Sequence, residues 1–169
     1  MKGKMVSTLA LCAWISGASA LAQEVNLTGT WKLNLAKSFL GADHQSAGYE
    51  LTKTIAQKNG VVSITDATRN ATVVNILLPD SQITTEIAVD GKEHQVKLAT
   101  GFPGMPSTIG TAVANWQGCT LEIRQLGTGF LGSKKQRLYL SKDGAELIVL
   151  VETHSTFADS ERRLVFDKQ

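Results

Sequence analysis

Hydrophobic and polar residues alternate with a period of two along most of the chain. The run from 27 to 33 shows this clearly, because Leu27, Trp31 and Leu33 fall on one face and polar residues on the other. Such alternation predicts β-strands with one buried face, since successive side chains in a strand point to opposite sides. Beyond residue 22, no long stretch carries the 3.6-residue apolar period of an amphipathic helix.

Turn residues separate the alternating runs. Asn59-Gly60 predicts a tight hairpin and Asp90-Gly91 predicts a turn, because Asn, Asp and Gly tolerate positive φ. Gln117-Gly118 and Asp143-Gly144 predict two more hairpins in the second half of the chain. Among the expected strands are 49–57, 72–78, 111–117, 119–126, 134–141, 145–153 and 160–167.

About ten short strands result, each turning within 8–12 residues. This spacing predicts an all-β protein, an antiparallel up-and-down barrel of about 8–10 strands, with a β-sandwich as the alternative. Two segments lack strand character: 35–48, where we expect one helical turn, and 101–110, a loop that holds two of the three prolines. The GxGxxG motif at 127–132 is expected to be a hairpin loop rather than a dinucleotide site, because the residues after it alternate like a strand.

Residues 1–22 have the three parts of a signal peptide. Two lysines precede an apolar stretch from Met5 to Ile15, and Ala20-Leu21-Ala22 supplies small residues for cleavage before Gln23. The apolar stretch is shorter than the roughly 20 residues that span a membrane. We therefore predict removal of this leader, a single β-barrel domain over 23–169, export to the periplasm or the extracellular medium, and no membrane insertion after cleavage.

Charge and cysteine content narrow the classes of function. Lys and Arg number 17 and Asp and Glu 15, and two of the lysines lie in the leader, so the rest of the chain is formally neutral. A neutral chain without a basic run is not expected to bind nucleic acid. Cys119 is the one cysteine after the leader, so it has no internal disulfide partner, and its place after Gly118 predicts partial exposure.

Motifs for catalysis or metal binding are missing from the sequence. His44, His94 and His154 are far apart and have no cysteine nearby, which does not fit the spacing of zinc ligands. The carboxylates are scattered, mostly on polar faces, and neither GxSxG nor HExxH occurs. We expect no metal, no cofactor and no catalysis. The alternative is an enzyme with its site in the barrel mouth, for which His94 and Tyr49 are the first candidates.

Six residues are candidates for contact with a ligand, because they fall on apolar faces of expected strands or on the 101–110 loop. Those on the strands, predicted to line the interior, are Tyr49, Ile87, His94 and Val96. Those on the loop, predicted to close the mouth, are Phe102 and Met105. The alternative for each is an ordinary core position, which the same alternation predicts equally well.

Gly29-Thr30-Trp31 in the first expected strand is the most informative local feature. Trp31 has inward parity, and so does Arg162 in the last expected strand, beside Leu164 and Phe166. If the first and last strands pair, the barrel closes, and Arg162 is predicted to lie over the indole of Trp31 in a cation–π contact.

A Gly-x-Trp on a first strand with an Arg on a last strand resembles the lipocalin (calycin) signature. The longer segment LTGTWKLNLAKS, at 27–38, resembles the opening of a group of small exported bacterial proteins described as lipocalin-like. In that group a central Asp-Gly-Lys-Glu and a terminal Tyr/Phe-Asp-Lys recur, as at 90–93 and 166–168 here. The resemblance implies a lipocalin-like barrel in an exported bacterial protein. The roles that it gives Gly29, Trp31 and Arg162 are structural, and it implies no particular ligand.

These observations favour an exported β-barrel that binds a small apolar or amphipathic molecule without catalysis, since barrels of about this size hold one small ligand. The alternative is a protein-interaction or inhibitor module with a filled core, which would use the loops at 101–110 and 127–133 as its surface. We expect a monomer.

Overall fold

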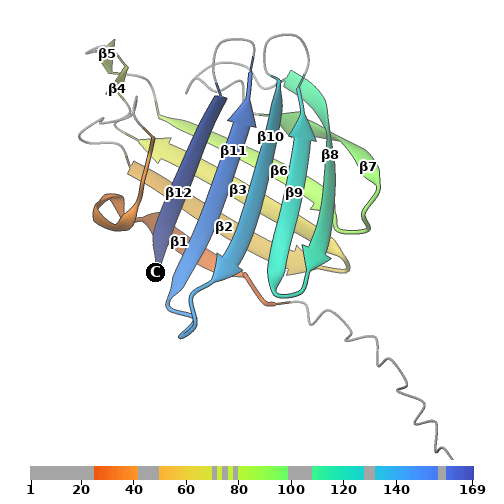
Figure 1. The fold of residues 1–169 in the computed structure, drawn as a ribbon, viewed down its shortest axis with the longest axis horizontal. Coiled ribbons are helices and arrows are strands. Elements are labelled where there is room, and N and C mark those ends of the chain that lie inside the picture. Colours follow the sequence, from red (N-terminus) through yellow and green to blue (C-terminus); the bar gives the residue numbers. More distant parts are fainter. Residues whose placement is uncertain are drawn as a thin grey trace, which may run out of the picture.

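The computed structural model describes residues 25–41, 50–69, 72–73, 76–77, 80–98, 108–127, 132–155 and 159–169. Ten strands among them form one antiparallel sheet that curls into a nearly closed barrel (Figure 1). These strands are β1 (Gly29–Leu33), β2 (Glu50–Lys58), β3 (Val61–Arg69), β6 (Ser81–Ala88), β7 (Glu93–Leu98), β8 (Thr108–Gln117), β9 (Thr120–Leu126), β10 (Ser133–Leu140), β11 (Glu146–His154) and β12 (Asp159–Lys168). A short 3-10 helix, η1 (Leu35–Lys37), follows β1, and β4 (Thr72–Val73) pairs with β5 (Ile76–Leu77) in a separate small sheet. No helix in this part of the chain is long and apolar enough to cross a membrane.

The strand order is β6-β3-β2-β1-β12-β11-β10-β9-β8-β7, so the first strand pairs with the last. Trp31 on β1 stands opposite Lys168 on β12. The two edge strands are β6 and β7, and the Thr85 hydroxyl of β6 donates a hydrogen bond to the carbonyl of Lys97 in β7 at 3.2 Å. The predicted all-β, up-and-down barrel is confirmed, and the β-sandwich is not the architecture.

Tight turns lie where the sequence predicts them. Asn59 and Gly60 have φ values of 52° and 73°, which are left-handed conformations that these two residue types adopt readily. The pairing of β8 with β9 and of β10 with β11 confirms the hairpins predicted at Gly118 and Gly144. The amide of Gly127 donates to the carbonyl of Gly132 at 2.9 Å, and strand β10 follows, so the GxGxxG motif lies in a hairpin as expected.

Two local predictions differ from the structure. The run at 72–78 is not one strand, because β4 and β5 pair with each other outside the barrel. Two-residue strands are too short to show a period, so alternation does not reveal the reversal between them. The loop predicted at 101–110 ends early, since β8 begins at Thr108. The helical turn predicted within 35–48 is η1, and residues 42–49 lie outside the described part.

The hydrophobic core runs through the barrel and is packed most tightly toward one end. We call the upper end the one at which β9 and β11 finish, at Leu126 and His154, and the lower end its opposite (Figure 1). The large inward side chains toward the lower end are almost fully buried, and include Trp31, Ile55, Ile87, Leu121, Leu138, Leu147 and Phe166. Burial of each such side chain stabilises the fold by about 1.5–3 kcal/mol. The indole Nε1 of Trp31 donates to the carbonyl of Leu27 at 3.1 Å, so its one polar group is satisfied.

Gly110 on β8 is packed too tightly for a side chain. A Cβ there would lie 2.3 Å from Cδ1 of Leu98 and 2.4 Å from the carbonyl oxygen of Leu126. The leucine side chain can rotate away, but the carbonyl belongs to the backbone of β9. Gly110→Ala is therefore expected to lower the free energy of unfolding by about 2 kcal/mol. Urea denaturation followed by circular dichroism measures this, and a loss below about 0.5 kcal/mol would show that β8 and β9 separate easily.

Candidate functional site

The inner face of the barrel changes character along its axis. Toward the lower end, the inward side chains of Leu121 and Phe166 are 0% exposed, so packing there is complete. Toward the upper end, Leu51 and Leu98 keep 7% of their surface and Val151 keeps 5%. These residues have the same inward parity, so the inner wall of the upper part presents apolar side chains that are buried but not fully covered.

Four charged side chains lie on the inner face of the barrel, from the level of Phe166, whose ring Lys53 contacts, toward the upper end. They come from four different strands, β2, β3, β10 and β12, and are Lys53, Asp66, Lys134 and Arg162. Each has the parity of buried apolar residues on its own strand. We call these four residues the inner charge cluster. It holds three cations and one carboxylate, so its ionised form has an excess of positive charge.

Lys53 and Asp66 form a direct ion pair. They stand opposite each other in the β2–β3 ladder, and Nζ of Lys53 lies 2.5 Å from Oδ1 of Asp66. The lysine side chain is 4% exposed and the aspartate side chain 40%, so the lysine is the buried member of the pair. Nζ of Lys53 also lies 5.8 Å from the ring centroid of Phe166, a favourable cation–π distance. The carboxylate of the inner charge cluster is thus committed to Lys53.

Arg162 contributes a donor without a partner. Its Nε and the Thr153 hydroxyl are both buried, and neither has a hydrogen-bond partner among the described residues. Thr153 on β11 stands opposite Lys134 on β10, whereas Arg162 on β12 stands opposite Val151, two residues further down β11. Lys134, Thr153 and Arg162 therefore present polar groups from three consecutive strands. A buried donor left unpaired costs about 1–3 kcal/mol, so an acceptor placed there is bound favourably.

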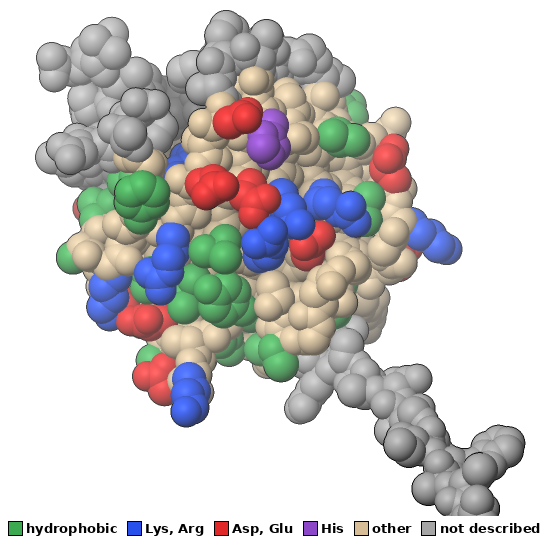
Figure 2. All heavy atoms as spheres, in the orientation of Figure 1, with side chains coloured by type: hydrophobic (Ala, Val, Ile, Leu, Met, Phe, Trp, Pro, Cys, Tyr) green, Lys and Arg blue, Asp and Glu red, His purple; other side chains and the backbone are tan. Residues whose placement is uncertain are grey.

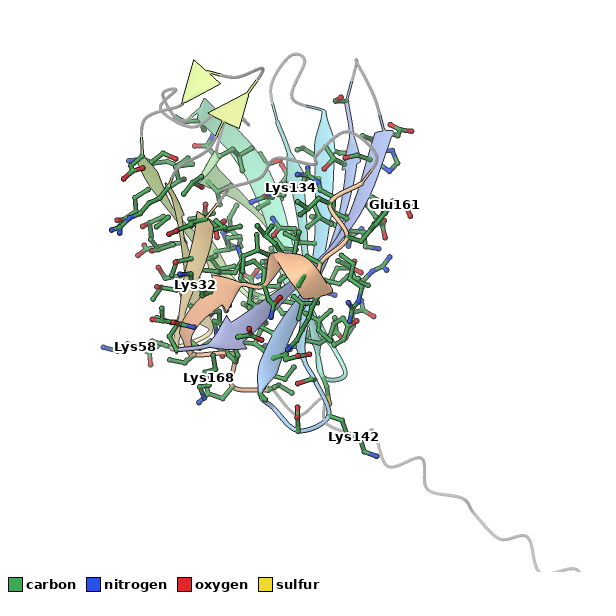
Figure 3. All side chains as sticks on the ribbon, turned by 90° about the vertical axis from the view of Figure 1, so that its left-hand side faces the viewer. Lys32, Lys58, Lys134, Lys142, Glu161 and Lys168 are labelled. Carbon is green, nitrogen blue, oxygen red and sulfur yellow. The ribbon has the colours of Figure 1, made fainter. Side chains whose placement is uncertain are left out.

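Lys134 is the most strongly perturbed group of the cluster. Burial lowers the pKa of its ammonium from 10.5 to about 8; the charge of Asp66 opposes this shift, and the charges of Lys53 and Arg162 add to it. In Figure 3, Lys134 lies between the walls of the barrel, whereas Lys142 lies at the periphery. No ion pair with another described residue neutralises Lys134.

Lys134→Met is expected to stabilise the ligand-free protein at pH 7. Because the pKa of Lys134 is about 8 in the folded state and near 10.5 in the unfolded state, the folded state binds this proton less tightly. The charged side chain therefore costs stability below pH 8, and the cost disappears as the pH rises from 8 to 10.5. The gain from the variant is at most about 3 kcal/mol. Thermal unfolding at pH 7 and pH 10 tests this, and a variant less stable than the original at pH 7 would contradict it.

The structure describes three of the six residues predicted to contact a ligand. Ile87 and Val96 lie on the inner face and are buried. His94 has the same inward parity but lies at the lower end, away from the inner charge cluster, where its Nε2 is 2.9 Å from Oδ1 of Asp90 and its side chain is 37% exposed. For all three, contact with a ligand stays a prediction. The other three lie outside the described residues and are Tyr49, Phe102 and Met105.

The cation over the indole of Trp31 is Lys168 and not Arg162. Nζ of Lys168 lies 5.6 Å from the Trp31 ring, in agreement with their pairing across β1 and β12. Arg162 comes six residues earlier, about 20 Å away along the strand. Its predicted inward parity is correct and its predicted height is wrong, because parity does not determine register. Gly29 lies against the indole, since a Cβ there would be 3.4 Å from Nε1 of Trp31.

The sequence analysis missed the inner charge cluster, although a signal was present. Lys134 shares parity with Leu138, and Lys53 shares parity with Leu51, so each is a charged residue at a position where alternation calls for an apolar one. Asp66 likewise shares the face of Ile64, and the expectation that the carboxylates lie on polar faces is wrong for it. Charged residues that interrupt an apolar face are the signal that would have identified the site.

Charged residues on the outer face of β9, β10 and β11, in contrast, are paired. Glu122 on β9 lies 3.0 Å from Nζ of Lys135 and 3.6 Å from Nε of Arg137, and Arg137 also contacts Glu152 at 2.8 Å. Figure 2 shows acidic and basic side chains side by side on this face. Exposed pairs of this kind each contribute at most about 1 kcal/mol. These outer cations have carboxylate partners, whereas Lys134 has no such partner among the described residues.

A hollow lies outside the barrel, beside β1, β2 and β12. It has a volume of 390 Å³, and its lining includes Lys32, Glu50 and Asp167. Asp167 accepts hydrogen bonds from Asn34 at 2.7 Å and from Lys37 at 3.2 Å, and these bonds lower the pKa of its carboxyl group. Because Asp167 already accepts hydrogen bonds from Asn34 and Lys37, the inner charge cluster is the stronger candidate for a site.

Other chemistry among the described residues is sparse. They contain no group of three or more His, Cys, Asp and Glu side chains placed to hold a metal ion. Cys119 is exposed in the turn between β8 and β9, in agreement with its predicted exposure. The inner charge cluster is therefore the candidate functional site.

Solved structures with a similar fold are known. The zebrafish ileal bile acid-binding protein complexed with cholic acid has a TM-score of 0.56 and 13% identity, over 84% of this chain and 98% of that one. Human cRBP IV has a TM-score of 0.53 and 15% identity, over 86% of this chain and 99% of that one. The fatty-acid-binding protein from Manduca sexta has a TM-score of 0.52 and 12% identity, over 83% of this chain and 98% of that one.

These likenesses confirm the calycin-like barrel fold that the sequence predicts. No family model matches the chain, and no curated protein matches its sequence.

Proposed function

We propose that this protein binds one small amphipathic molecule inside the barrel. The observation that carries the proposal is the inner wall of the upper part, where apolar side chains that keep some exposure lie beside the inner charge cluster. A ligand with an apolar body and a polar end matches such a wall, because binding pockets are mostly apolar with a few polar groups that fix orientation.

The fold supports the same proposal. Two of the three proteins with this barrel are named for the molecules that they bind: one is a bile acid-binding protein complexed with cholic acid, and the other is a fatty-acid-binding protein. The third is human cRBP IV. Barrels of this size hold a small ligand inside when side chains do not fill them completely. The filled lower end then serves as the floor of the site, and the upper end as its entrance.

Binding is tested with the neutral dye N-phenyl-1-naphthylamine, which fluoresces in apolar surroundings. We expect saturable fluorescence with about one dye per chain. Val151→Trp fills the upper interior, because Val151 faces inward, and is expected to abolish the signal. Leu150→Trp is the matched control, since the next residue of β11 faces outward and is expected to leave the signal unchanged. Equal signals from both variants would place the dye outside the barrel and contradict the proposal.

We further propose that the chain is an exported, non-catalytic monomer. Residues 1–22 support export through their lysines, apolar stretch and small-residue cleavage site, as does the resemblance of the 27–38 segment to small exported bacterial proteins. Intact-mass measurement on protein recovered from producing cells is expected to give a chain that begins at Gln23. A chain that retains residues 1–22 would contradict export with cleavage, and light scattering tests the monomer.

A further inference from the structure

We infer that the polar end of the ligand is an acid, a carboxylate bound between Lys134, Thr153 and Arg162 at the upper end of the barrel. The inference rests on the proposed function and adds the chemical class of the ligand to it.

The charge balance of the inner face favours binding of an anion, because three cations there face one carboxylate. Asp66 lies 2.5 Å from Nζ of Lys53 and is committed to that pair. Lys134 and Arg162 are left without a carboxylate partner among the described residues, although cations on the outer face have such partners. Unpaired buried cations are costly in a folded protein, and an anionic ligand that pairs with them removes that cost.

The hydrogen-bonding groups point to the same headgroup. Nε of Arg162 and the hydroxyl of Thr153 are buried and unpartnered among the described residues, and both can donate to oxygen. Lys134 stands directly opposite Thr153 in the β10–β11 ladder. A carboxylate offers two oxygens with several lone pairs, so it can accept bonds from more than one of these donors. An alcohol or an ammonium headgroup cannot neutralise them.

The position of the cluster orients the ligand. Apolar inner residues continue below it, since Val151 and Leu164 on β11 and β12 lie beside or beneath Arg162 on the inner face. A carboxylate at the height of Lys134 therefore leaves its hydrocarbon part against apolar wall. The ligand expected from this arrangement is a linear or polycyclic carboxylic acid rather than a neutral lipid.

Binding of an acid should depend on the protonation of Lys134. The titratable groups that face it are Asp66 on β3, Lys53 on β2 and Arg162 on β12, while its ladder neighbours Gln125 and Thr153 do not titrate. The pKa of Lys134 is about 8 in the free protein, and a bound carboxylate raises it. Affinity for an acid is therefore constant between about pH 6 and pH 8, where the carboxyl group of the ligand is ionised, and falls by about tenfold between pH 8 and pH 10.

The test compares ligands that differ only in the headgroup. Dodecanoic acid, dodecan-1-ol and dodecyltrimethylammonium each compete with N-phenyl-1-naphthylamine for the purified protein. We expect the acid to compete at least about tenfold better than the other two, as charge-assisted hydrogen bonds allow. If the dye binds inside the barrel and the alcohol competes as well as the acid, the acid inference fails while the proposed function stands. If neither the dye nor any dodecyl compound binds, both fail.

Variants of Lys134 test whether this residue binds the carboxylate. Lys134→Met and Lys134→Gln are expected to lower the affinity for dodecanoic acid by about tenfold and to leave the affinity for dodecan-1-ol unchanged. Both variants are also expected to remove the pH dependence of acid binding above pH 8. Lys135→Met is the matched control, because the next residue of β10 faces outward and pairs with Glu122 at 3.0 Å. The control is expected to bind the acid like the original protein. Loss of acid binding in Lys135→Met, or its retention in both Lys134 variants, would overturn the inference.

Discussion

Trp31→Ala is expected to lower the free energy of unfolding by about 4 kcal/mol, the largest effect of any single substitution considered. The indole is 1% exposed at the lower end of the barrel, where it packs under Lys168 and donates to the carbonyl of Leu27. Alanine removes this packing and leaves a cavity beneath the point where the first and last strands meet. Urea denaturation followed by far-ultraviolet circular dichroism measures the loss.

Two control variants separate the contributions to this effect. Trp31→Phe keeps an aromatic ring but loses the hydrogen bond to Leu27, and is expected to cost about 1 kcal/mol from that bond. Lys168→Met keeps an apolar chain over the ring and removes the charge, and is expected to cost less than about 1 kcal/mol. A loss below about 1 kcal/mol in Trp31→Ala itself would show that the indole does not secure the lower end.

Asp66→Asn is expected to lower the free energy of unfolding by about 3 kcal/mol. The substitution removes the negative charge beside Lys53, whose side chain is only 4% exposed, and leaves three cations of the inner charge cluster without compensation. Lys53→Met is expected to cost much less, because it leaves behind an aspartate that is 40% exposed and can be hydrated. The two single variants are compared by thermal and urea denaturation at pH 7.

The double variant Lys53→Met/Asp66→Asn completes this comparison. Because it removes both charges of the pair, it is expected to be more stable than Asp66→Asn alone. Equal losses from the two single variants would show that the exposed carboxylate and the buried ammonium are equivalent, contrary to the burial difference between them.

Local signals in the sequence predicted the strands and their turns. The hairpin at Asn59-Gly60 depends on two residues that tolerate positive φ, and the inward parity of Val96 depends on its neighbours two positions away. Both kinds of information lie within a few residues, so they are readable without the fold. The reversal between β4 and β5 was missed because strands of two residues have no period to detect.

Register and height in the barrel were not readable in the same way. The pairing of β1 with β12 was predicted, but the residue opposite Trp31 is Lys168, six positions after Arg162. Register depends on how the whole sheet closes, which no local pattern specifies. The inner charge cluster shows the opposite situation. Lys134 is detectable from its parity alone, because it is a charged residue on the apolar face of its strand.

The pairing of the first strand with the last also bears on how the barrel folds. β1 cannot complete its ladder until β12 exists, and β12 ends one residue before the end of the chain. Contacts between residues so far apart in sequence form slowly, because a long loop must close before they stabilise anything. A chain that lacks its last strand has unpaired backbone on both β1 and β11, two edges that invite association with other chains. Completion of the barrel therefore depends on β12, and a chain in which β12 is not yet paired exposes both of these edges.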